Sequence, residues 1–544
     1  MTDTFLRAPP FPGPELRIME RGRGLAEARP VADEILHLLA RERIGGSFWM
    51  PPSEPGSPES VVVRCTQAER EVVVANHIGG SGTTVHWFES QPRVSKSDRD
   101  RAGRDPWSAL VSATRLVAHG DDEWVAIAAL SSVAVELLSD GAYGRIGEGA
   151  EALRLRLAQH LGAARYFDPF TGLETSPEAL IAVLGEWRRQ IEANRTVAAA
   201  CGMAWWKHDE IRRFLWLPER QIPIRRSIRR AIAEARKAGG KLAVWPSRIG
   251  RDMVELAEQQ GVELVRIEDG FIRSAGLGSD LVPPSSVVVD HRGIHFDPSG
   301  PSDLEHILAH AAFPPALLAR AQALRQTIVA AGISKYAARP GEARPERPTH
   351  RKVVLVAAQV EDDMSVVAGG GGIRSNLEVL RRAHAREPGA EIWYRPHPDI
   401  EAGHRVGAVD DRLIHQYADR IVREGTMASL LDSVDAVHVL TSLTGFEALL
   451  RGKQVTCHGT PFYAGWGLTT DAGAIPARRG RQLTLDQLVA GVLILYPRYL
   501  DPVSRLPCPV EVLVARLAEG QAANRLSPVS WLRRWQGRFM ARWR

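Results

Sequence analysis

The sequence predicts an α/β fold with two facing Rossmann-like domains, preceded by a degenerate α/β half-module. Three observations lead to this prediction. Strand patterns and helix patterns alternate from about residue 195 onward, as they do in parallel sheets wrapped by helices. A charged segment with three prolines at 337–351 divides that alternation in two. The first 190 residues repeat part of the second half in a shortened form.

The composition excludes several classes of protein. Hydrophobic residues make up 44% of the 544 residues and charged residues 24%, values typical of a folded globular chain. The formal net charge of +5 is small for this length, so nucleic acid is not predicted as a partner. The four cysteines form no CxxC pair, and no run of 18 apolar residues occurs. We therefore expect a reduced, cytoplasmic protein without a zinc knuckle or a membrane-spanning helix.

The first Rossmann-like domain is predicted at 195–336. Apolar runs at 241–246, 262–267 and 287–290 indicate strands. A helix is expected at 251–261, ending at a glycine. Ser302 followed by Glu305 forms a capping-box pattern, so another helix is expected near 303–312.

The second Rossmann-like domain is predicted at 350–525. Strands are expected at 352–359, 391–398, 436–442 and 454–459, and helices at 376–386 and 445–452. In doubly wound sheets, ligands bind at the carboxyl ends of the strands. Polar residues that follow these strands are therefore the first candidates for a binding site.

The region 1–190 is predicted to be a degenerate half-module. Residues 107–120 parallel 427–440, residues 123–141 parallel 443–459, and residues 166–184 parallel 499–517. Short strands are also expected at 61–63 and 72–74. Three polar residues of the second copy are replaced in the first: Thr441 by Asp121, Ser442 by Asp122 and Glu447 by Ile127. Chance likeness between α/β units is the alternative, whereas a true repeat implies a first copy that has lost catalysis.

Three polar residues accompany the strand predicted at 436–442. Thr441 and Ser442 precede a helix, whose free backbone N–H groups favour an anion such as a phosphate. Glu447 lies further into that helix, where apolar neighbours imply burial and a carboxylate can bind ribose hydroxyls. The alternatives are a plain helix cap for Thr441 and Ser442 and a solvated charge for Glu447.

A glycine-rich loop follows the strand predicted at 352–359. Its four glycines, Gly371 among them, allow the backbone to approach a ligand closely or simply form a flexible loop. Arg374 is a candidate for binding a carboxylate or a phosphate bidentately. Gln359 is expected to face the cleft, and Asn376 follows the loop as a further candidate.

Two adjacent carboxylates, Glu268 and Asp269, follow the strand predicted at 262–267. Because successive side chains of a strand point in opposite directions, one is expected in the cleft and the other in supporting structure. Arg273 and Ser274 come shortly after and are candidates for holding a substrate carboxylate. The alternative is a surface loop with a salt bridge.

Five motifs together resemble the KpsC family of capsule polysaccharide proteins. They are IEDGFIRSAGLGSDLVPPSSVVVDHRGIHFDPSGPSDLEHIL (267–308), QVEDDMSVVAGGGGIRSN (359–376), YRPHPD (394–399), TSLTGFEALLRGK (441–453) and PFYAGWGLTTD (461–471). The resemblance covers residues 195–520 strongly and 105–190 weakly. Members of that family are retaining β-Kdo transferases that use CMP-β-Kdo, build the Kdo linker between lipid and capsule, and carry two transferase modules in tandem. The resemblance thus implies a GT-B-like arrangement of the two Rossmann-like domains.

The resemblance also implies roles for single residues. Asp269 is expected to be the nucleophile that forms a glycosyl-enzyme, with Glu268 as general acid/base or orienting partner, and the reverse assignment stays open. His397 and Pro398, which come after Arg395, are expected to bind the nucleotide phosphate. Neither a metal nor a cofactor is expected, because the core motifs contain no DxD sequence. CMP-Kdo enters as the donor substrate.

The segment 527–544 is predicted to be a basic amphipathic helix at a membrane surface. It contains no acidic residue, and four aromatic residues recur every four positions among five arginines: Trp531, Trp535, Phe539 and Trp543. Packing on the protein itself is the alternative. With the resemblance, this segment implies a peripheral protein of the inner membrane that takes a CMP-sugar donor and a glycolipid acceptor. Other proteins of capsule synthesis and export are expected partners.

Two other functions stay open at this point. One is transfer from another CMP-nonulosonate, such as a CMP-activated sialic acid, because the phosphate-binding elements do not distinguish these donors. The other is a catalytically inactive scaffold of capsule assembly, which the degenerate first copy suggests. Against the scaffold stand four residues that the second module keeps together: Asp269, His397, Ser442 and Glu447.

Overall fold

The computed structural model describes residues 4–22, 29–53, 60–78, 84–89, 103–273, 282–334, 345–347, 350–401 and 405–521. The chain divides into two compact units. Unit 1 comprises Met1–Thr196 with Leu215–Ile222, and unit 2 comprises Val197–Phe214 with Pro223–Arg544. Ser274 and the segment 527–544 lie outside the described residues, so the predictions made for them stay predictions.

Unit 1 is built on a parallel sheet of four strands in the order β3-β2-β4-β5. The strands are β2 (Ser60–Cys65), β3 (Val85–Glu89), β4 (Ala113–Ala118) and β5 (Ala134–Leu137). The helices are α1 (Asp33–Glu42), α2 (Arg70–His77), α4 (Pro106–Leu110), α5 (Glu123–Leu130), α6 (Ala150–Gly162) and α7 (Pro177–Arg195). A small antiparallel sheet is formed by β1 (Met19–Glu20), β6 (Arg165–Phe167) and β7 (Glu174–Thr175).

One predicted strand of unit 1 is wrong. Residues 72–74 belong to helix α2, in which Val73 is buried and Val72 is 60% exposed. The reason is a local start signal just upstream. Thr66 and Glu69 form a reciprocal capping box that opens a short 3-10 helix (Gln67–Glu69), and α2 continues from it.

Unit 2 contains a seven-stranded mixed sheet, the first sheet, in the order β20-β19-β12-β11-β10-β8-β9. Its strands are β8 (Val197–Cys201), β9 (Ile224–Arg225), β10 (Lys241–Val244), β11 (Leu264–Asp269), β12 (Ser286–Asp290), β19 (Pro497–Leu500) and β20 (Pro507–Cys508). Its helical segments include η2 (Trp205–Lys207), α8 (His208–Phe214), α9 (Ile228–Ala238), α10 (Arg251–Gln259), α11 (Asp303–His310), α12 (Pro315–Ala330) and α20 (Val510–Ala518). Strands β9, β8, β10 and β11 run parallel, so their carboxyl ends meet at one edge.

Unit 2 also contains a second sheet of six parallel strands in the order β15-β14-β13-β16-β17-β18. They are β13 (Val353–Ala357), β14 (Glu391–Arg395), β15 (Arg420–Ile421), β16 (Ala436–Val439), β17 (Gln454–Cys457) and β18 (Thr470–Asp471). The first strand, β13, is buried along its whole length. The order reverses between β13 and β16, which is the arrangement of a Rossmann sheet. The α/β class with two Rossmann-like sheets is therefore confirmed.

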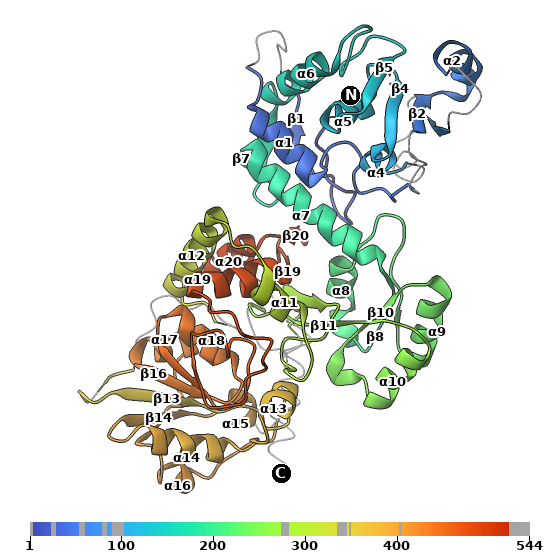
Figure 1. Ribbon diagram of the computed structural model, residues 1–544. Helices are drawn as coiled ribbons and strands as arrows, with labels where there is room; N and C mark the ends of the chain where they lie inside the picture. Colours follow the sequence, from blue (N-terminus) through green and yellow to red (C-terminus); the bar gives the residue numbers. More distant parts are fainter. Residues whose placement is uncertain are drawn as a thin grey trace. The chain divides into compact units, whose positions relative to one another are not determined.

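Helices cover both faces of the second sheet (Figure 1). Helices α14 (Asn376–Arg386) and α16 (Asp411–Ile414) lie on one face, and α17 (Met427–Ser433) and α18 (Leu443–Leu450) lie on the other. The remaining helices are α13 (Met364–Gly369), α15 (Pro398–Glu401) and α19 (Leu485–Val489), followed by a π-helical turn, Ala490–Leu495. Helix α14 has the bounds that the sequence predicts.

The last strands of the chain return to the first sheet. Strand β19 pairs with β12, and β20 pairs with β19, both antiparallel. The range predicted for the second domain, 350–525, therefore includes two strands that complete the sheet of the first.

The sheet of unit 1 matches the middle of the second sheet strand for strand. The order β3-β2-β4-β5 corresponds to β14-β13-β16-β17, and in each set the strand that comes first in the chain is flanked by the second on one side and by the two later strands on the other. The hairpin β6-β7 and helix α7 likewise correspond to β19-β20 and α20. This agreement of order and direction supports the internal repeat that the sequence suggests.

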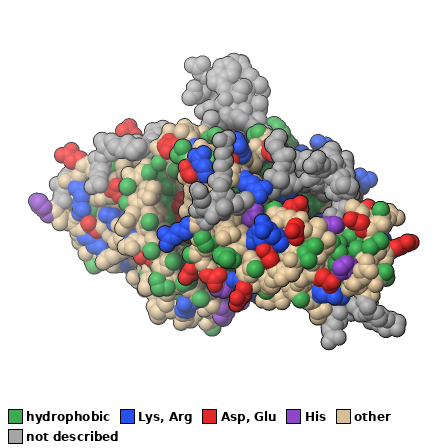
Figure 2. Space-filling model, turned by 90° about the horizontal axis from the view of Figure 1, so that it is seen from above, with side chains coloured by type: hydrophobic (Ala, Val, Ile, Leu, Met, Phe, Trp, Pro, Cys, Tyr) green, Lys and Arg blue, Asp and Glu red, His purple; other side chains and the backbone are tan. Residues whose placement is uncertain are grey.

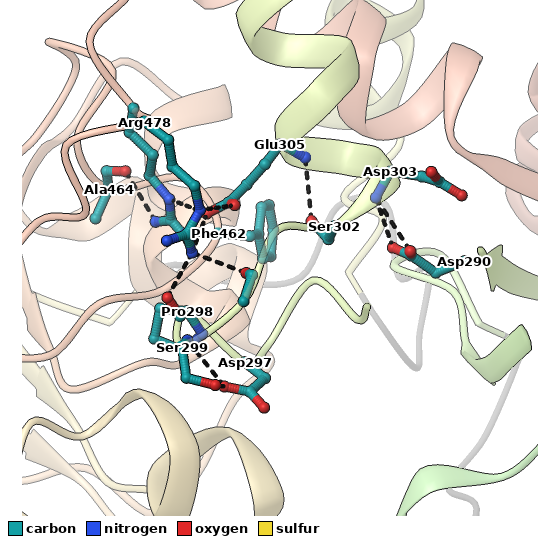
Figure 3. Close-up of polar contacts among 12 residues, drawn as sticks. Asp290, Asp297, Pro298, Ser299, Ser302, Asp303, Glu305, Phe462, Ala464 and Arg478 are labelled. Atoms are coloured by element: carbon teal, nitrogen blue, oxygen red, sulfur yellow. Dashed lines mark hydrogen bonds and ion pairs between the residues drawn. The ribbon is translucent and has the colours of Figure 1, made fainter. Parts of the chain in front are cut away.

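Three arginines of unit 2 hold helix α11 at both ends, and Figure 3 shows the contacts at its start. At its start, the Glu305 carboxylate accepts from Arg478 Nε at 2.6 Å and from Arg479 Nε at 2.5 Å. At its end, Arg481 donates to the last carbonyls of the helix, as cations at a helix C-terminus do. Ser302 Oγ accepts from Glu305 N at 3.1 Å as predicted, but the Glu305 side chain goes to the arginines, so the capping box is only half formed.

The charges of the surface are mixed. On the face that Figure 2 shows, Lys and Arg side chains are interspersed with Asp and Glu. All four cysteines are buried free thiols. In the described part of the chain, no helix is both long and apolar enough to cross a bilayer.

Candidate functional site

The point where the strand order of the second sheet reverses is lined by residues predicted from the sequence. Gln359 follows β13, and Thr441 follows β16. The Thr441 backbone N–H donates to Gln359 Oε1 at 2.8 Å, and Gln359 Nε2 donates to Thr441 Oγ1 at 3.1 Å. This paired contact ties the two strand ends together where Rossmann sheets bind their ligands.

Asn376 fixes the backbone beside this contact. Its Oδ1 accepts from Gln359 N at 2.9 Å, and its Nδ2 donates to Gln359 O at 2.8 Å and to Gly407 O at 3.0 Å. The side chain is buried, and its amide is engaged by the protein itself. Asn376 thus shapes the site rather than lining it.

The glycine-rich loop has two distinct parts. At Gly369 a Cβ would meet Thr441 Cγ2 at 3.1 Å, so glycine here permits close packing against the strand end. Gly371 and Gly372 have φ of +59° and +90° with open space around them. Arg374, just beyond, is exposed, and its guanidinium is available to an anion from solvent.

Helix α18 presents its N-terminus at the same edge. Ser442 is its N-cap, with Oγ accepting from Thr444 N at 3.2 Å. The Tyr463 hydroxyl donates to the Ser442 carbonyl, which fixes the strand-to-helix turn from the other side. Glu447 is buried one turn further along the helix, at 8% exposure, so the alternative of a solvated charge is excluded.

Arg395 and His397 lie after β14 at this edge, with different surroundings. The Arg395 guanidinium donates to the carbonyls of Val422, Glu424 and Gly425, so it anchors the loop after β15. His397 Nδ1 accepts from Asp399 N at 3.2 Å. In the neutral ring the proton is therefore on Nε2, which is the atom that a donor to a phosphate needs. Pro398 begins α15, a position that suits its fixed φ.

Asp269 ends β11 in the first sheet and is held by two cations. Its Oδ1 lies 2.8 Å from Lys207 Nζ, and its Oδ2 lies 2.7 Å from Arg273 Nε. Burial acts to raise the pKa of Asp269, but the charges of Lys207 and Arg273 outweigh it and hold the pKa well below its usual range. The Asp269 carboxylate is therefore ionised at neutral pH.

The two neighbours of Asp269 have supporting contacts. Arg273 is only 2% exposed and also donates to the Val282 carbonyl, so its described contacts are with the protein itself. Glu268 accepts from the Asp269 backbone N–H at 3.0 Å. Gly270, next along the chain, accommodates the close approach of Ser286, since a Cβ there would lie 2.3 Å from Ser286 Oγ.

Aromatic contacts connect the Asp269 loop with the N-terminal part of α18. The Phe271 ring lies 4.6 Å from the Phe462 ring and 6.4 Å from that of Phe446, between centroids. Phe446 precedes Glu447 on α18, and Phe462 precedes Tyr463. The structure therefore brings Asp269 and the α18 terminus, predicted from motifs more than 150 residues apart, to the two sides of one aromatic cluster.

Sequence reasoning missed Lys207 and Tyr463. Lys207 belongs to MAWWKHDE (203–210), in which a lone lysine follows two tryptophans just after a strand. A lysine that directly follows two tryptophans was a usable signal in the sequence. Its partner Asp269 lies 62 positions away, so the contact could not be predicted from the local sequence. Within the described residues, no group of three or more His, Cys, Asp or Glu side chains forms a possible metal site.

Unit 1 has a different arrangement at the corresponding helix. Asp122 caps α5 by accepting from Trp124 N at 3.0 Å. The same carboxylate accepts from Arg64 Nε at 2.9 Å, and the Arg64 guanidinium lies 4.6 Å from the centroid of the Trp124 ring. A side chain of the protein thus occupies the place that an anion would take at this helix terminus.

Comparison with known proteins shows similarity to one protein family and to several relatives. Residues 241–499 match the family described as capsule polysaccharide biosynthesis protein. The capsule polysaccharide modification protein LipA of Neisseria meningitidis serogroup A is 40% identical over 352 residues, which are 64% of this chain and 49% of LipA. The lipopolysaccharide-processing protein LpsZ of Rhizobium meliloti is 44% identical over 45% of this chain and 56% of its own length. The chain thus spans about half the length of the curated relatives it matches.

Two solved structures also resemble the chain. One is described as Thermosulfurimonas dismutans KpsC, beta Kdo 2,4 transferase, with 30% identity, a TM-score of 0.50, and coverage of 59% of this chain and 98% of that one. This chain belongs to the KpsC-like family of capsule polysaccharide proteins. The other structure is described as the beta Kdo 2,7 transferase of the same KpsC, with 34% identity, 59% and 99% coverage, and a TM-score of 0.49.

The family match lies within unit 2. The family match spans β10 to β19, and so includes both Asp269 and the α18 terminus. The half-module of unit 1 ends before the match begins. The KpsC-like part of the chain is therefore unit 2.

Proposed function

We propose that the chain is a retaining β-Kdo transferase that uses CMP-Kdo to extend a lipid-linked Kdo linker in capsular polysaccharide biosynthesis. The observation that carries the proposal is the ionised Asp269, fixed at the edge of the first sheet and connected through Phe271 to the α18 terminus. The likeness to the KpsC structure described as a beta Kdo 2,4 transferase supports Kdo as the sugar.

The second sheet would bind the donor. The α18 terminus, with Thr441 and Ser442, offers N–H and hydroxyl donors to the CMP phosphate. His397 would donate from Nε2 to the same phosphate and stabilise the charge that develops as it leaves. The buried Glu447 carboxylate would accept from the ribose hydroxyls. Arg374 would bind the Kdo carboxylate from the exposed side of the glycine-rich loop.

The chemistry would proceed in two displacements. In the first, an Asp269 oxygen attacks the anomeric carbon, the bond to the phosphate oxygen breaks, and the electron pair leaves with CMP. In the second, an acceptor hydroxyl attacks the same carbon from the opposite face, the ester bond breaks, and Asp269 regains its charge. Two inversions give net retention. Glu268, next to Asp269, is the candidate to take the acceptor proton.

The acceptor and the location follow from the same proposal. A glycolipid acceptor requires access to the inner membrane, and the basic aromatic segment 527–544 is the candidate for peripheral attachment there. No metal ion and no organic cofactor enters the proposed reaction. Partners in capsule synthesis and export belong to the proposal through the family.

The test compares wild type with Asp269→Asn in transfer from CMP-Kdo, generated in situ, to a synthetic lipid-like Kdo acceptor. Mass spectrometry should show a product heavier by one Kdo unit with the wild type and none with Asp269→Asn. Asp252 is an exposed residue of α10, and Asp252→Asn serves as the matched control, which should keep full activity. Wild type that binds CMP but forms no product would point to another CMP-nonulosonate. Absence of CMP binding would favour a scaffold.

A further inference from the structure

A buried ammonium lies beside Asp269, and the two displacements described above give it no task. Lys207 ends the 3-10 helix η2, after strand β8, and is 6% exposed. Its Nζ lies 3.5 Å from the centroid of the Trp245 ring and 5.1 Å from that of Trp206. Two aromatic faces and one carboxylate thus surround a charge that water would otherwise solvate.

The charged groups that face Lys207 come from two elements. Strand β11 supplies Asp269 and Glu268, and the segment after it supplies Arg273. Burial is the main effect that lowers the pKa of Lys207, and the Asp269 carboxylate opposes it. A buried lysine keeps its charge only with such a partner. The ammonium and the carboxylate therefore hold one another ionised.

The geometry also fixes the carboxylate in space. Lys207 binds Oδ1 at 2.8 Å and Arg273 binds Oδ2 at 2.7 Å, so the two oxygens are held by different elements. Arg273 is itself anchored to the Val282 carbonyl, and Lys207 to the tryptophan rings. The plane of the carboxylate is thus set from both sides. A nucleophile gains from this because its attacking oxygen is aimed before the substrate binds.

We propose that Lys207 is a positioning residue for the nucleophile, which orients Asp269 and keeps it ionised for attack on the anomeric carbon. This inference rests on the proposed transferase function. It adds a residue outside the family match, since Lys207 precedes residue 241. It also gives η2 a role in catalysis, because that helix connects β8 to the edge at which Asp269 lies.

The experiment compares wild type, Lys207→Met and Lys207→Arg, with Lys241→Met as the matched control. Lys241 lies in the same sheet but forms a surface ion pair with Glu263. In Lys207→Met the acid limb of the kcat profile should move up by roughly one to three pH units, because an adjacent cation lowers a carboxyl pKa by that much. The KM for CMP-Kdo and the affinity for CMP should stay unchanged. Lys207→Arg should restore the position of the limb.

A second readout needs no activity. At neutral pH the Lys207→Met variant keeps the Asp269 carboxylate buried with one cation fewer beside it. The melting temperature of the variant should therefore lie below that of the wild type. Acidification from pH 5 to pH 3 should narrow this gap, because the wild type loses the stability of the ionised pair as the pH falls below the ordinary pKa of a carboxyl group, whereas the variant, whose Asp269 pKa lies closer to that ordinary value, has less of it to lose. Lys241→Met should show no such narrowing.

The outcomes separate the two proposals. An active wild type with an unshifted acid limb in Lys207→Met would overturn the positioning role and leave the transferase function standing. An inactive wild type would overturn the transferase function, and the melting temperatures would then decide on the pairing. A gap that stays constant between pH 5 and pH 3 would overturn the inference in either case.

Discussion

The sheet of unit 1 and the second sheet of unit 2 have the same strand order, yet they differ where a Rossmann sheet binds its ligand. In unit 2 the helix terminus after β16 carries the neutral hydroxyls of Thr441 and Ser442. In unit 1 the terminus after β4 carries Asp122, whose charge is already matched by Arg64. Two sheets with a shared strand order thus carry different residues at the corresponding helix terminus, which illustrates that function depends on the residues at strand ends rather than on the sheet.

A second difference lies inside the helices. Glu447 is buried in α18, and Ile127 is buried in α5. An apolar side chain thus takes the place of a carboxylate at the corresponding position of the helix. In unit 1, Asp122 and Ile127 stand where unit 2 carries Ser442 and Glu447. Three predictions test this comparison.

The largest effect is expected from importing the carboxylate of unit 1 into unit 2. Ser442→Asp places a negative charge at the α18 terminus, where it caps the helix but repels the CMP phosphate. We expect CMP affinity, measured by calorimetry, to fall on the order of 100-fold, or about 2.7 kcal/mol. Asp122→Asn is the control, because it keeps a capping side chain in unit 1 and should leave the affinity unchanged. If Ser442→Asp binds CMP with unaltered affinity, the CMP phosphate does not bind at the α18 terminus.

A smaller effect is expected from Glu447→Ile, which copies Ile127. The variant should fold normally, since an apolar side chain of similar size replaces a buried one. It should bind CMP slightly more than tenfold more weakly, because the loss of a hydrogen bond to a charged group costs about 1.5 kcal/mol at the lower end of its range. Cytidine should lose the same factor, since the contact is to the ribose. Glu378→Ile on α14 is the control, and a loss seen for CMP but not for cytidine would contradict the ribose role.

The smallest effect concerns acid stability and is confined to unit 2. His438 Nδ1 lies 3.0 Å from His458 Nε2, and burial lowers the pKa of His458 to about 4. Ala118 of unit 1 stands at the position of His438 in the repeat. When the pH falls from 6.5 to 4, His458 binds a proton in the unfolded chain but stays largely neutral in the folded one. The free energy of unfolding should therefore decrease by about 1–3 kcal/mol over this range.

Denaturant unfolding of wild type and His458→Gln at pH 7, 6 and 5 checks this. In His458→Gln the free energy of unfolding should decrease less steeply as the pH falls. His37→Gln changes an exposed histidine of unit 1 and should behave like the wild type. Equal slopes in all three proteins would show that the buried pair does not set the acid stability.

Local patterns predicted much of the second sheet. Helix α14 and the strand-to-helix turn at Ser442 follow from apolar periodicity and capping residues, which act over a few positions. Asp269 and Glu447 were proposed as site residues from motifs, and their roles stay predictions. The misses come from contacts between distant residues. Lys207 contacts Asp269, which is 62 positions away in the sequence, and Glu305 contacts Arg479, which is 174 positions away. Neither contact could be predicted from the local sequence.

The return of β19 to the first sheet has a consequence for the order of synthesis. Until Pro497 has left the ribosome, β12 has no partner on one side, and the buried Asp290 lacks the Tyr496 hydroxyl that donates to it at 2.7 Å. At roughly 5–20 residues per second, the interval from residue 290 to residue 497 lasts on the order of ten to forty seconds. During that time the nascent chain exposes an unpaired, valine-rich strand edge, which is a template for aggregation. Expression slowed or truncated before Pro497 should therefore yield insoluble protein, even though Asp269 and the α18 terminus have already been made.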